Sequence, residues 1–212
     1  MTSMGKSEKM HTQSLRHQPQ QARSHATIQH ILDVAAKLYA EKGFDNVSTN
    51  YIAKQAKISV GSLYRFFPNK EAILSTLVDH YIDTLKTVLP TSDNVDIPMA
   101  DVARLMIKSV LGFRQKHPAM SQIMGAPYEN HMPQAAMQMH LTLKAWIEET
   151  LSNYYPELGE QDRYLCAAAS MGMVRGMLGM MQPPDKIAPD QTIDEIVTAL
   201  MAYVDAFVSR ST

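Results

Sequence analysis

The chain has 212 residues, 45% of them hydrophobic, which excludes a disordered protein and is enough for one or two modest domains with an apolar core. Its single cysteine excludes an intrachain disulfide and a thiolate metal cluster, and is typical of a reducing cytosol. The net charge of −1 is unevenly distributed, because residues 1–70 carry ten Lys and Arg against four Asp and Glu, whereas residues 71–212 carry ten against seventeen. This asymmetry is typical of a nucleic-acid-binding module joined to a non-binding body, with a chance fluctuation of surface charge as the alternative.

Residues 1–23 are polar and show no helical or strand periodicity. They predict a disordered basic arm, and no apolar stretch follows the first basic residues, so we expect no signal peptide. Arg23 and the arm before it could reach a minor groove of DNA; a solvated tail is an equally good interpretation.

Four helices are predicted next. Apolar residues at three- and four-residue spacing predict a helix from Ser24 that ends at Gly43. Two serines provide N-caps: Ser48 for a helix over 49–55 and Ser59 for a helix over 60–66. Asn69 is expected to cap a long fourth helix over 70–89.

The rest of the chain also has helical periodicity. We expect a polar linker at 91–97 and helices near 98–116, 118–124, 133–155, 160–182 and 191–209, separated by Pro and Gly residues. Thr192 and Glu195 predict a capping box at the start of the last helix. The apolar window 165–181 is too short for a membrane span and is interrupted by Arg175, so we expect a buried helix in a cytoplasmic protein, with Cys166 as a small buried residue. The fold class is therefore all-α.

The second and third helices are short and closely spaced, as a helix-turn-helix requires. The third helix enters the major groove in such modules, and its first residues here are Ser59, Val60, Gly61 and Ser62. Glycine inside a helix costs about 1 kcal/mol relative to alanine. Close approach to DNA explains Gly61, with relief of crowding near the turn as the alternative.

Residues 48–53 (STNYIA) and 58–72 (ISVGSLYRFFPNKEA) closely resemble the TetR/AcrR family of bacterial regulators, whose pattern in the third helix is roughly VSxGxLYxxFxxKexL. Ile58 in place of the usual Val is a minor departure. The specific match covers residues 25–75, and the remainder matches only in architecture. The resemblance implies a helix-turn-helix DNA-binding domain over 24–70 and a helical ligand-binding and dimerisation domain over 71–212.

The resemblance also assigns roles to individual residues. It implies phosphate contacts by Thr49, Tyr64 and Lys70, the last helped by the dipole of the fourth helix. It places Asn50, Val60, Ser62 and Arg65 where they can face base edges. The complete predicted DNA-binding set is Thr49, Asn50, Ser59, Val60, Gly61, Ser62, Tyr64, Arg65 and Lys70.

The C-terminal half is expected to dimerise and to bind a ligand. The resemblance implies a homodimer through the last two long helices, and small residues such as Gly172 and Gly176 favour close helix packing, although an internal core face is the alternative. Twelve of the 16 methionines lie between Met99 and Met181, which suits a pocket for an apolar effector or gap-filling in an ordinary core. Candidate ligand-binding residues are Met106, Phe113, Met124, Met137, Trp146, Met173 and Arg175. Arg175 would anchor an anionic group or pair with an acidic residue across the dimer.

Catalytic motifs are missing from the sequence: it has no Gly-rich phosphate loop, no HExxH and no GxSxG, and its histidines lack a metal-ligand spacing. We therefore expect no enzyme activity, metal or cofactor. The sequence predicts a repressor that binds an inverted-repeat operator in double-stranded DNA as a dimer and is released by a small hydrophobic effector. The alternatives are an architectural DNA-binding protein, or a helical ligand carrier or enzyme with an incidental helix-turn-helix.

Overall fold

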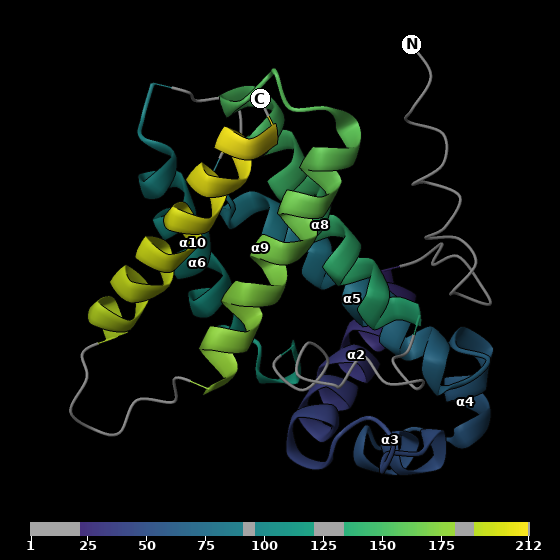
Figure 1. Cartoon of the computed structure of the whole chain (residues 1–212). Coiled ribbons are helices and arrows are strands. Elements are labelled where there is room, and N and C mark those ends of the chain that lie inside the picture. The colour runs from purple at the N-terminus through teal and green to yellow at the C-terminus, as the bar shows by residue number, and fades with distance from the viewer. Residues whose placement is uncertain (1–21, 91–95, 121–133, 181–188, 212) are drawn as a thin grey trace. The chain divides into compact units, whose positions relative to one another are not determined.

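The computed structural model describes residues 22–90, 96–120, 134–180 and 189–211, and the regular structure in these ranges is entirely α-helical (Figure 1). This confirms the predicted fold class. The helices are α2 (Ala22–Lys42), α3 (Thr49–Gln55), α4 (Val60–Phe66), α5 (Lys70–Val88), α6 (Met99–Lys116), α8 (Gln134–Tyr154), α9 (Glu160–Met180) and α10 (Pro189–Ser211). Residues 1–21 of the predicted basic arm and residues 121–124 of the predicted helix 118–124 lie outside the described residues.

Two helix starts differ from the prediction. Helix α2 begins at Ala22, so Arg23 is in its first turn and not in the arm. Helix α10 begins at Pro189, and Thr192 is buried inside it instead of capping it, so the predicted capping box is wrong. Proline is well suited to a first helical position because the N–H that it lacks would have no helical partner there.

The described chain forms two compact units. The first contains the described residues up to Thr84 and those in Arg114–Met139, and the second contains Leu85–Phe113 and the chain from His140 onward. The predicted functional boundary at residue 70 remains a prediction, because compactness alone does not say which residues touch DNA.

Side-chain caps define the short helices of the first unit. The Ser48 hydroxyl accepts from the Tyr51 N–H (3.2 Å) and the Ser59 hydroxyl from the Ser62 N–H (3.0 Å). The Asn69 side chain accepts from the Ala72 N–H (2.8 Å) at the start of α5. Each satisfies a backbone donor that the helix itself leaves free. The fully buried side chains of α2, α3 and α4 include Ile31, Tyr39, Ile52 and Leu63.

The turn between α3 and α4 has a left-handed residue that is not glycine. The N–H groups of Ile58 and Lys57 donate to the carbonyls of Ala53 (3.0 Å) and Lys54 (3.2 Å), which is the hydrogen-bond pattern of a Schellman motif. Lys57 adopts φ +54° at the position where glycine is usual. A side chain in this conformation costs roughly 1–2 kcal/mol.

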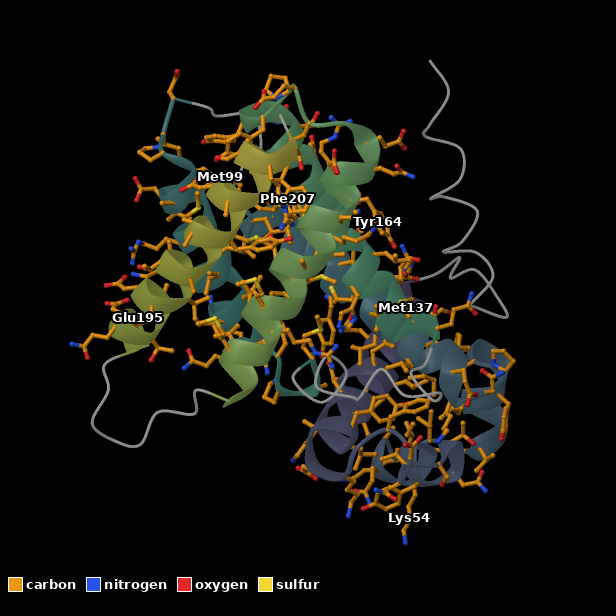
Figure 2. The ribbon with its side chains drawn as sticks, viewed as in Figure 1. Lys54, Met99, Met137, Tyr164, Glu195 and Phe207 are labelled. Carbon is orange, nitrogen blue, oxygen red and sulfur yellow. The ribbon has the colours of Figure 1, made fainter. Side chains whose placement is uncertain are left out.

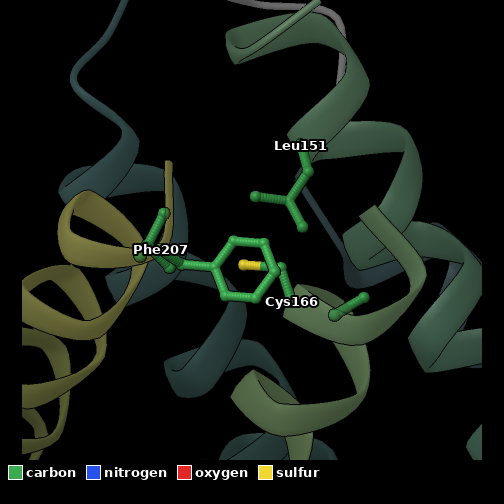
Figure 3. Packing of buried hydrophobic residues seen from close by; sticks show 5 residues of the cluster. Leu151, Cys166 and Phe207 are labelled. Carbon is green, nitrogen blue, oxygen red and sulfur yellow. The ribbon is translucent and has the colours of Figure 1, made fainter. Parts of the chain in front are cut away.

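Two hydrophobic clusters form the core of the second unit. The Phe207 cluster consists of Leu151, Cys166, Ala167, Val204 and Phe207 (Figure 3). The Ile196 cluster consists of Ile107, Ile193, Ile196 and Val197. Cys166 is fully buried, as predicted, and burial raises the pKa of its thiol.

Hydrogen bonds and ion pairs fasten α8 and α10 to neighbouring segments of the second unit. The Trp146 indole N–H donates to the Pro90 carbonyl (3.1 Å), and the Tyr154 hydroxyl donates to the Ile97 carbonyl (2.7 Å). Helix α8 thus holds both ends of the connection between α5 and α6. On α6, Arg104 pairs with Asp194 and Lys108 with Asp190 of α10.

The conformation of Lys57 leads to a stability prediction. Lys57→Val should lower the free energy of unfolding by about 1–3 kcal/mol, because a β-branched side chain fits the left-handed region poorly. Lys57→Gly should change it by less than about 1 kcal/mol, because relief of strain offsets the larger backbone entropy loss of glycine. Urea unfolding measures both variants. Lys54→Val, in the preceding helix, is the control and should cost under about 0.7 kcal/mol; equal losses for the two valine variants would contradict the prediction.

Candidate nucleic-acid interface

Helices α3 and α4 carry the residues that the sequence predicted for base contacts, Asn50 on α3 and Val60, Ser62 and Arg65 on α4. Val60 is 40% exposed, and Asn50 and Arg65 are also exposed. The guanidinium of Arg65 lies 4.7 Å from the centroid of the Phe66 ring, which is buried in the helix-turn-helix. This contact places Arg65 against the module while its side chain remains exposed to a partner.

Gly61 lies near the start of α4 and has open space around its missing side chain. A Cβ built there would meet no atom within 4 Å. Crowding inside the chain therefore does not require glycine at this position. Relief of crowding near the turn, the alternative explanation of Gly61, loses its support. Glycine weakens this seven-residue helix, and close approach of a binding partner remains the predicted reason for it.

The two predicted phosphate-binding hydroxyls lie together. Thr49 Oγ1 of α3 and the Tyr64 hydroxyl of α4 are 3.0 Å apart, and one donates to the other. This hydrogen bond joins the two helices on an exposed surface. Because one hydroxyl proton is used between the two side chains, the pair cannot donate two protons to a phosphate oxygen while this hydrogen bond is kept.

The serines at the start of α4 are involved in capping. Ser59 Oγ accepts from the Ser62 N–H and is 2.8 Å from Ser62 Oγ. Ser59 is therefore part of the helix cap that orients α4, while the partly buried Ser62 retains hydrogen-bonding capacity toward a base edge.

Lys70 has a structural role in addition to the predicted phosphate contact. Its Nζ donates to the Phe44 carbonyl (3.3 Å) and the Asp45 carbonyl (3.5 Å), and lies 4.3 Å from the centroid of the Phe44 ring. An ammonium group has three donors, and two are engaged here. One donor and the positive charge remain available to a phosphate.

Two side-chain contacts between α2 and α3 were not predicted from the sequence. His30 Nε2 lies 3.1 Å from the Ala56 carbonyl at the end of α3. Lys42 Nζ lies 5.6 Å from the centroid of the Tyr51 ring. Lys54 extends outward from α3 as a further exposed cation (Figure 2). The His30 and Lys42 contacts each join α2 to α3 or its end, so no pattern within one helix could reveal them.

The candidate ligand-binding residues have varied environments. Phe113 is buried, Met106, Trp146, Met173 and Arg175 are partly buried, Met137 is exposed, and Met124 lies outside the described residues. Met137 belongs to the first unit, whereas the other described members belong to the second. Trp146 uses its indole N–H to hold the Pro90 carbonyl, and Arg175 NH1 lies 3.5 Å from Nε2 of the buried His140. Their grouping into one pocket remains a prediction.

Two negative results concern only the described ranges. None of the helices there is long and apolar enough to cross a membrane. In the same ranges, no three His, Cys, Asp or Glu side chains lie together as a possible metal site.

Comparison with known proteins identifies the family. Residues 31–77 match the model of bacterial regulatory proteins of the tetR family, and residues 98–203 match the tetracyclin repressor-like C-terminal domain. The chain belongs to the TetR family of bacterial regulatory proteins. This TetR-family transcriptional regulator therefore contains the DNA-binding module that the sequence predicted, followed by the family's C-terminal domain.

Individual relatives of the regulator are distant. It is 28% identical over 134 residues to YuxN of Bacillus subtilis, an uncharacterized HTH-type transcriptional regulator, covering 61% of this chain and 46% of that one. It is 23% identical over 179 residues to the nucleoid occlusion factor SlmA of Vibrio cholerae, covering 81% and 91%. The regulator spans about half the length of the first curated relatives that it matches.

Solved structures share the fold. NalD, the secondary repressor of the MexAB-OprM multidrug efflux pump in Pseudomonas aeruginosa, superposes with a TM-score of 0.64 at 18% identity, covering 86% of this chain and 98% of that one. A SmeT–triclosan complex superposes with a TM-score of 0.60 at 19% identity, covering 87% and 91%. These identities show the fold alone.

The two classes of DNA contact should differ in mutants. Lys70→Ala should weaken binding to operator and random DNA alike and reduce the salt dependence by about one released counterion, because the lysine meets a phosphate. Asn50→Ala and Arg65→Ala should each lose discrimination at particular base pairs, by about 1–3 kcal/mol. Affinities measured over a salt series test this assignment, and melting temperatures show whether loss of the Lys70 contacts loosens the loop between α2 and α3 that contains Phe44. A changed base preference only in Lys70→Ala would reverse it.

Proposed function

We propose that this TetR-family regulator is a ligand-responsive repressor that binds an inverted-repeat operator as a homodimer and is released by a small hydrophobic effector. It acts on DNA and not as an enzyme. The observation that carries the proposal is helix α4, which presents exposed Val60 and Arg65 beside the open backbone at Gly61. Exposed side chains above a backbone that a partner can approach are what major-groove reading requires.

The outward face of α9 supports the dimer. Tyr164 and Leu165 are 53% and 54% exposed, and Figure 2 shows Tyr164 on this helix. Gly172 and Gly176 continue the same face and are exposed, and a Cβ at either would meet no atom within 4 Å. Large apolar side chains followed by glycines form a surface on which a second helix can pack closely.

Helix α10 has a matching face. Thr198, Ala202, Ala206 and Ser209 are small, exposed, and spaced by three or four residues. Helices α9 and α10 pack against each other through the Phe207 cluster, so their outward faces belong to one rigid pair of helices. Two such pairs from two subunits would form a four-helix bundle.

The effector proposal rests on the second unit and on the names of two structural relatives. One of these is a repressor of a multidrug efflux pump and another is bound to triclosan, so this fold accommodates such roles in those proteins. Here α9 contributes the partly buried Met173 and Met177 to the second unit. Flexible thioethers adapt to apolar ligands of varied shape.

Selection of binding sites from random duplex DNA tests the operator proposal. We expect an inverted repeat whose half-site centres are about one helical turn (~34–36 Å) apart, or a modest extension of that, because a two-fold dimer presents two recognition helices. The symmetric site should resist excess competitor DNA. An enriched site without dyad symmetry would contradict the dimeric mode of binding.

Gly176→Leu tests the dimer interface. The open space at Gly176 means that the subunit itself should tolerate leucine, whereas a partner helix packed on the glycine should not. We expect sedimentation to show that the variant is monomeric. Its operator affinity should fall because a monomer presents only one recognition helix. Gly112→Leu is the matched control, because a Cβ at Gly112 of α6 also meets no atom within 4 Å; it should remain dimeric. A dimeric Gly176→Leu protein would place the interface elsewhere.

A second candidate function is architectural coating of DNA. The similarity to a nucleoid occlusion factor over 81% of this chain favours a role on the chromosome beyond one operator. This function predicts weak sequence preference, so competitor DNA would displace the selected site as easily as a random one. A ligand carrier or enzyme with an incidental helix-turn-helix would bind neither the selected site nor random DNA.

A further inference from the structure

The second unit contains a buried hydroxyl without a hydrogen-bond partner. Ser170, in the middle of α9, is only 4% exposed, and its Oγ has no partner within the described part of the chain. Buried polar atoms are nearly always hydrogen-bonded, because an unpaired one loses its hydration and gains nothing in return. Ser170 therefore needs a physical explanation.

Ser170 lies between the two hydrophobic clusters of the second unit. On α9 it is three residues after Ala167 of the Phe207 cluster and four before Val174, which packs against the Ile196 cluster. The three residues share one helix face. On α10, Leu200 packs against the Phe207 cluster and Met201 against the Ile196 cluster, and both are only partly buried. The hydroxyl thus lies on α9 between the residues that pack against the two clusters.

Neighbouring groups do not satisfy Ser170. Cys166 lies one turn earlier on the same helix, and its thiol interacts with the Ser170 side chain, but sulfur is a weak hydrogen-bonding group and the hydroxyl keeps no partner at hydrogen-bond geometry. Thr150 of α8 shows the usual arrangement: it is also buried, and its hydroxyl donates to the Trp146 carbonyl (2.9 Å). The buried hydroxyls of Thr150 and Ser170 therefore differ, because the first has a hydrogen-bond partner and the second does not.

We propose that Ser170 is the polar anchor of the effector site, which lies between the Phe207 and Ile196 clusters and takes a neutral, mainly apolar molecule with one hydroxyl or carbonyl oxygen. This inference rests on the proposed ligand-responsive function and specifies its ligand. A serine hydroxyl both donates and accepts, so it can bond either kind of oxygen. The clusters themselves consist of apolar residues, and a charged ligand group there would lose its hydration without compensation.

The first test concerns the ligand-free protein. Ser170→Ala should raise the melting temperature by about 2–4 °C, because it removes an unpaired buried hydroxyl. Thr150→Val should lower it, because that hydroxyl is bonded. Ser209→Ala is the control for the higher helix propensity of alanine, since its exposed hydroxyl bonds the Asp205 carbonyl on α10. A lower melting temperature for Ser170→Ala would show that its hydroxyl is satisfied and would overturn the proposal.

The second test uses matched ligands with and without one hydroxyl. Dissociation constants of 2-naphthol and naphthalene, and of 4-hexylphenol and hexylbenzene, are measured by equilibrium dialysis on the full-length wild-type and Ser170→Ala proteins. In at least one pair, the preference for the hydroxylated member should fall about fivefold to tenfold in the variant, as expected for one lost hydrogen bond. Equal preferences in the two proteins for both pairs, or no binding of either phenol, would overturn the proposal.

Operator binding of the same two proteins separates this inference from the proposed function. Both should retain operator affinity, because Ser170 lies in the second unit and the recognition helix in the first. If both bind operator and neither pair shows the change in preference, only the Ser170 assignment fails. If neither binds a selected operator, the repressor function fails, whatever the phenols do.

Discussion

The anchoring of Lys70 to the loop before α3 is the interaction on which the arrangement of the DNA-binding module depends. The ammonium group holds the carbonyls of Phe44 and Asp45, and the Tyr39 hydroxyl of α2 reaches the Lys70 carbonyl (3.5 Å). Tyr39 and Phe44 also contact each other edge to face, with centroids 5.3 Å apart. The end of α2, the loop and the start of α5 are therefore fixed together. A recognition helix can read a register along DNA only if its scaffold is fixed in this way.

Helix α9 shows how one sequence pattern serves two faces. Its small residues comprise an inward set, with Ala167 and Ser170 buried, and an outward set, with Gly172 and Gly176 exposed. The inward set allows Phe207 to pack against Cys166 (Figure 3). Ala167 belongs to the same cluster. The outward glycines meet nothing in their own subunit. The sequence pattern alone does not distinguish the inward small residues from the outward ones. Only the orientation of the helix in the structure separates the two sets.

Local chemistry made most of the fold predictable. Ser48, Ser59 and Asn69 cap the helices that the sequence assigned to them, since a cap and the N–H that it receives are three residues apart. Residues whose partners are distant in sequence were not predictable. Trp146 was expected in the wall of a pocket, yet its indole bonds a carbonyl 56 residues away. The hydrogen bond between the Thr49 and Tyr64 hydroxyls likewise depends on how α3 and α4 pack.

Any effector response must pass through elements that already belong to both units. Helices α5, α6 and α8 each begin in one unit and end in the other. Within the second unit, Trp146 and Tyr154 fasten the connection between α5 and α6 to α8, so a displacement of α8 acts on two of these helices at once. A ligand changes DNA affinity only if it binds one arrangement of the helices better than another. The unpaired Ser170 hydroxyl makes the ligand-free arrangement less stable than it would be with a hydrogen-bond partner. An effector whose oxygen bonds this hydroxyl favours the arrangement that brings that oxygen to Ser170. The polarity of one buried atom would then contribute both to ligand selection and to the free energy that opposes operator binding.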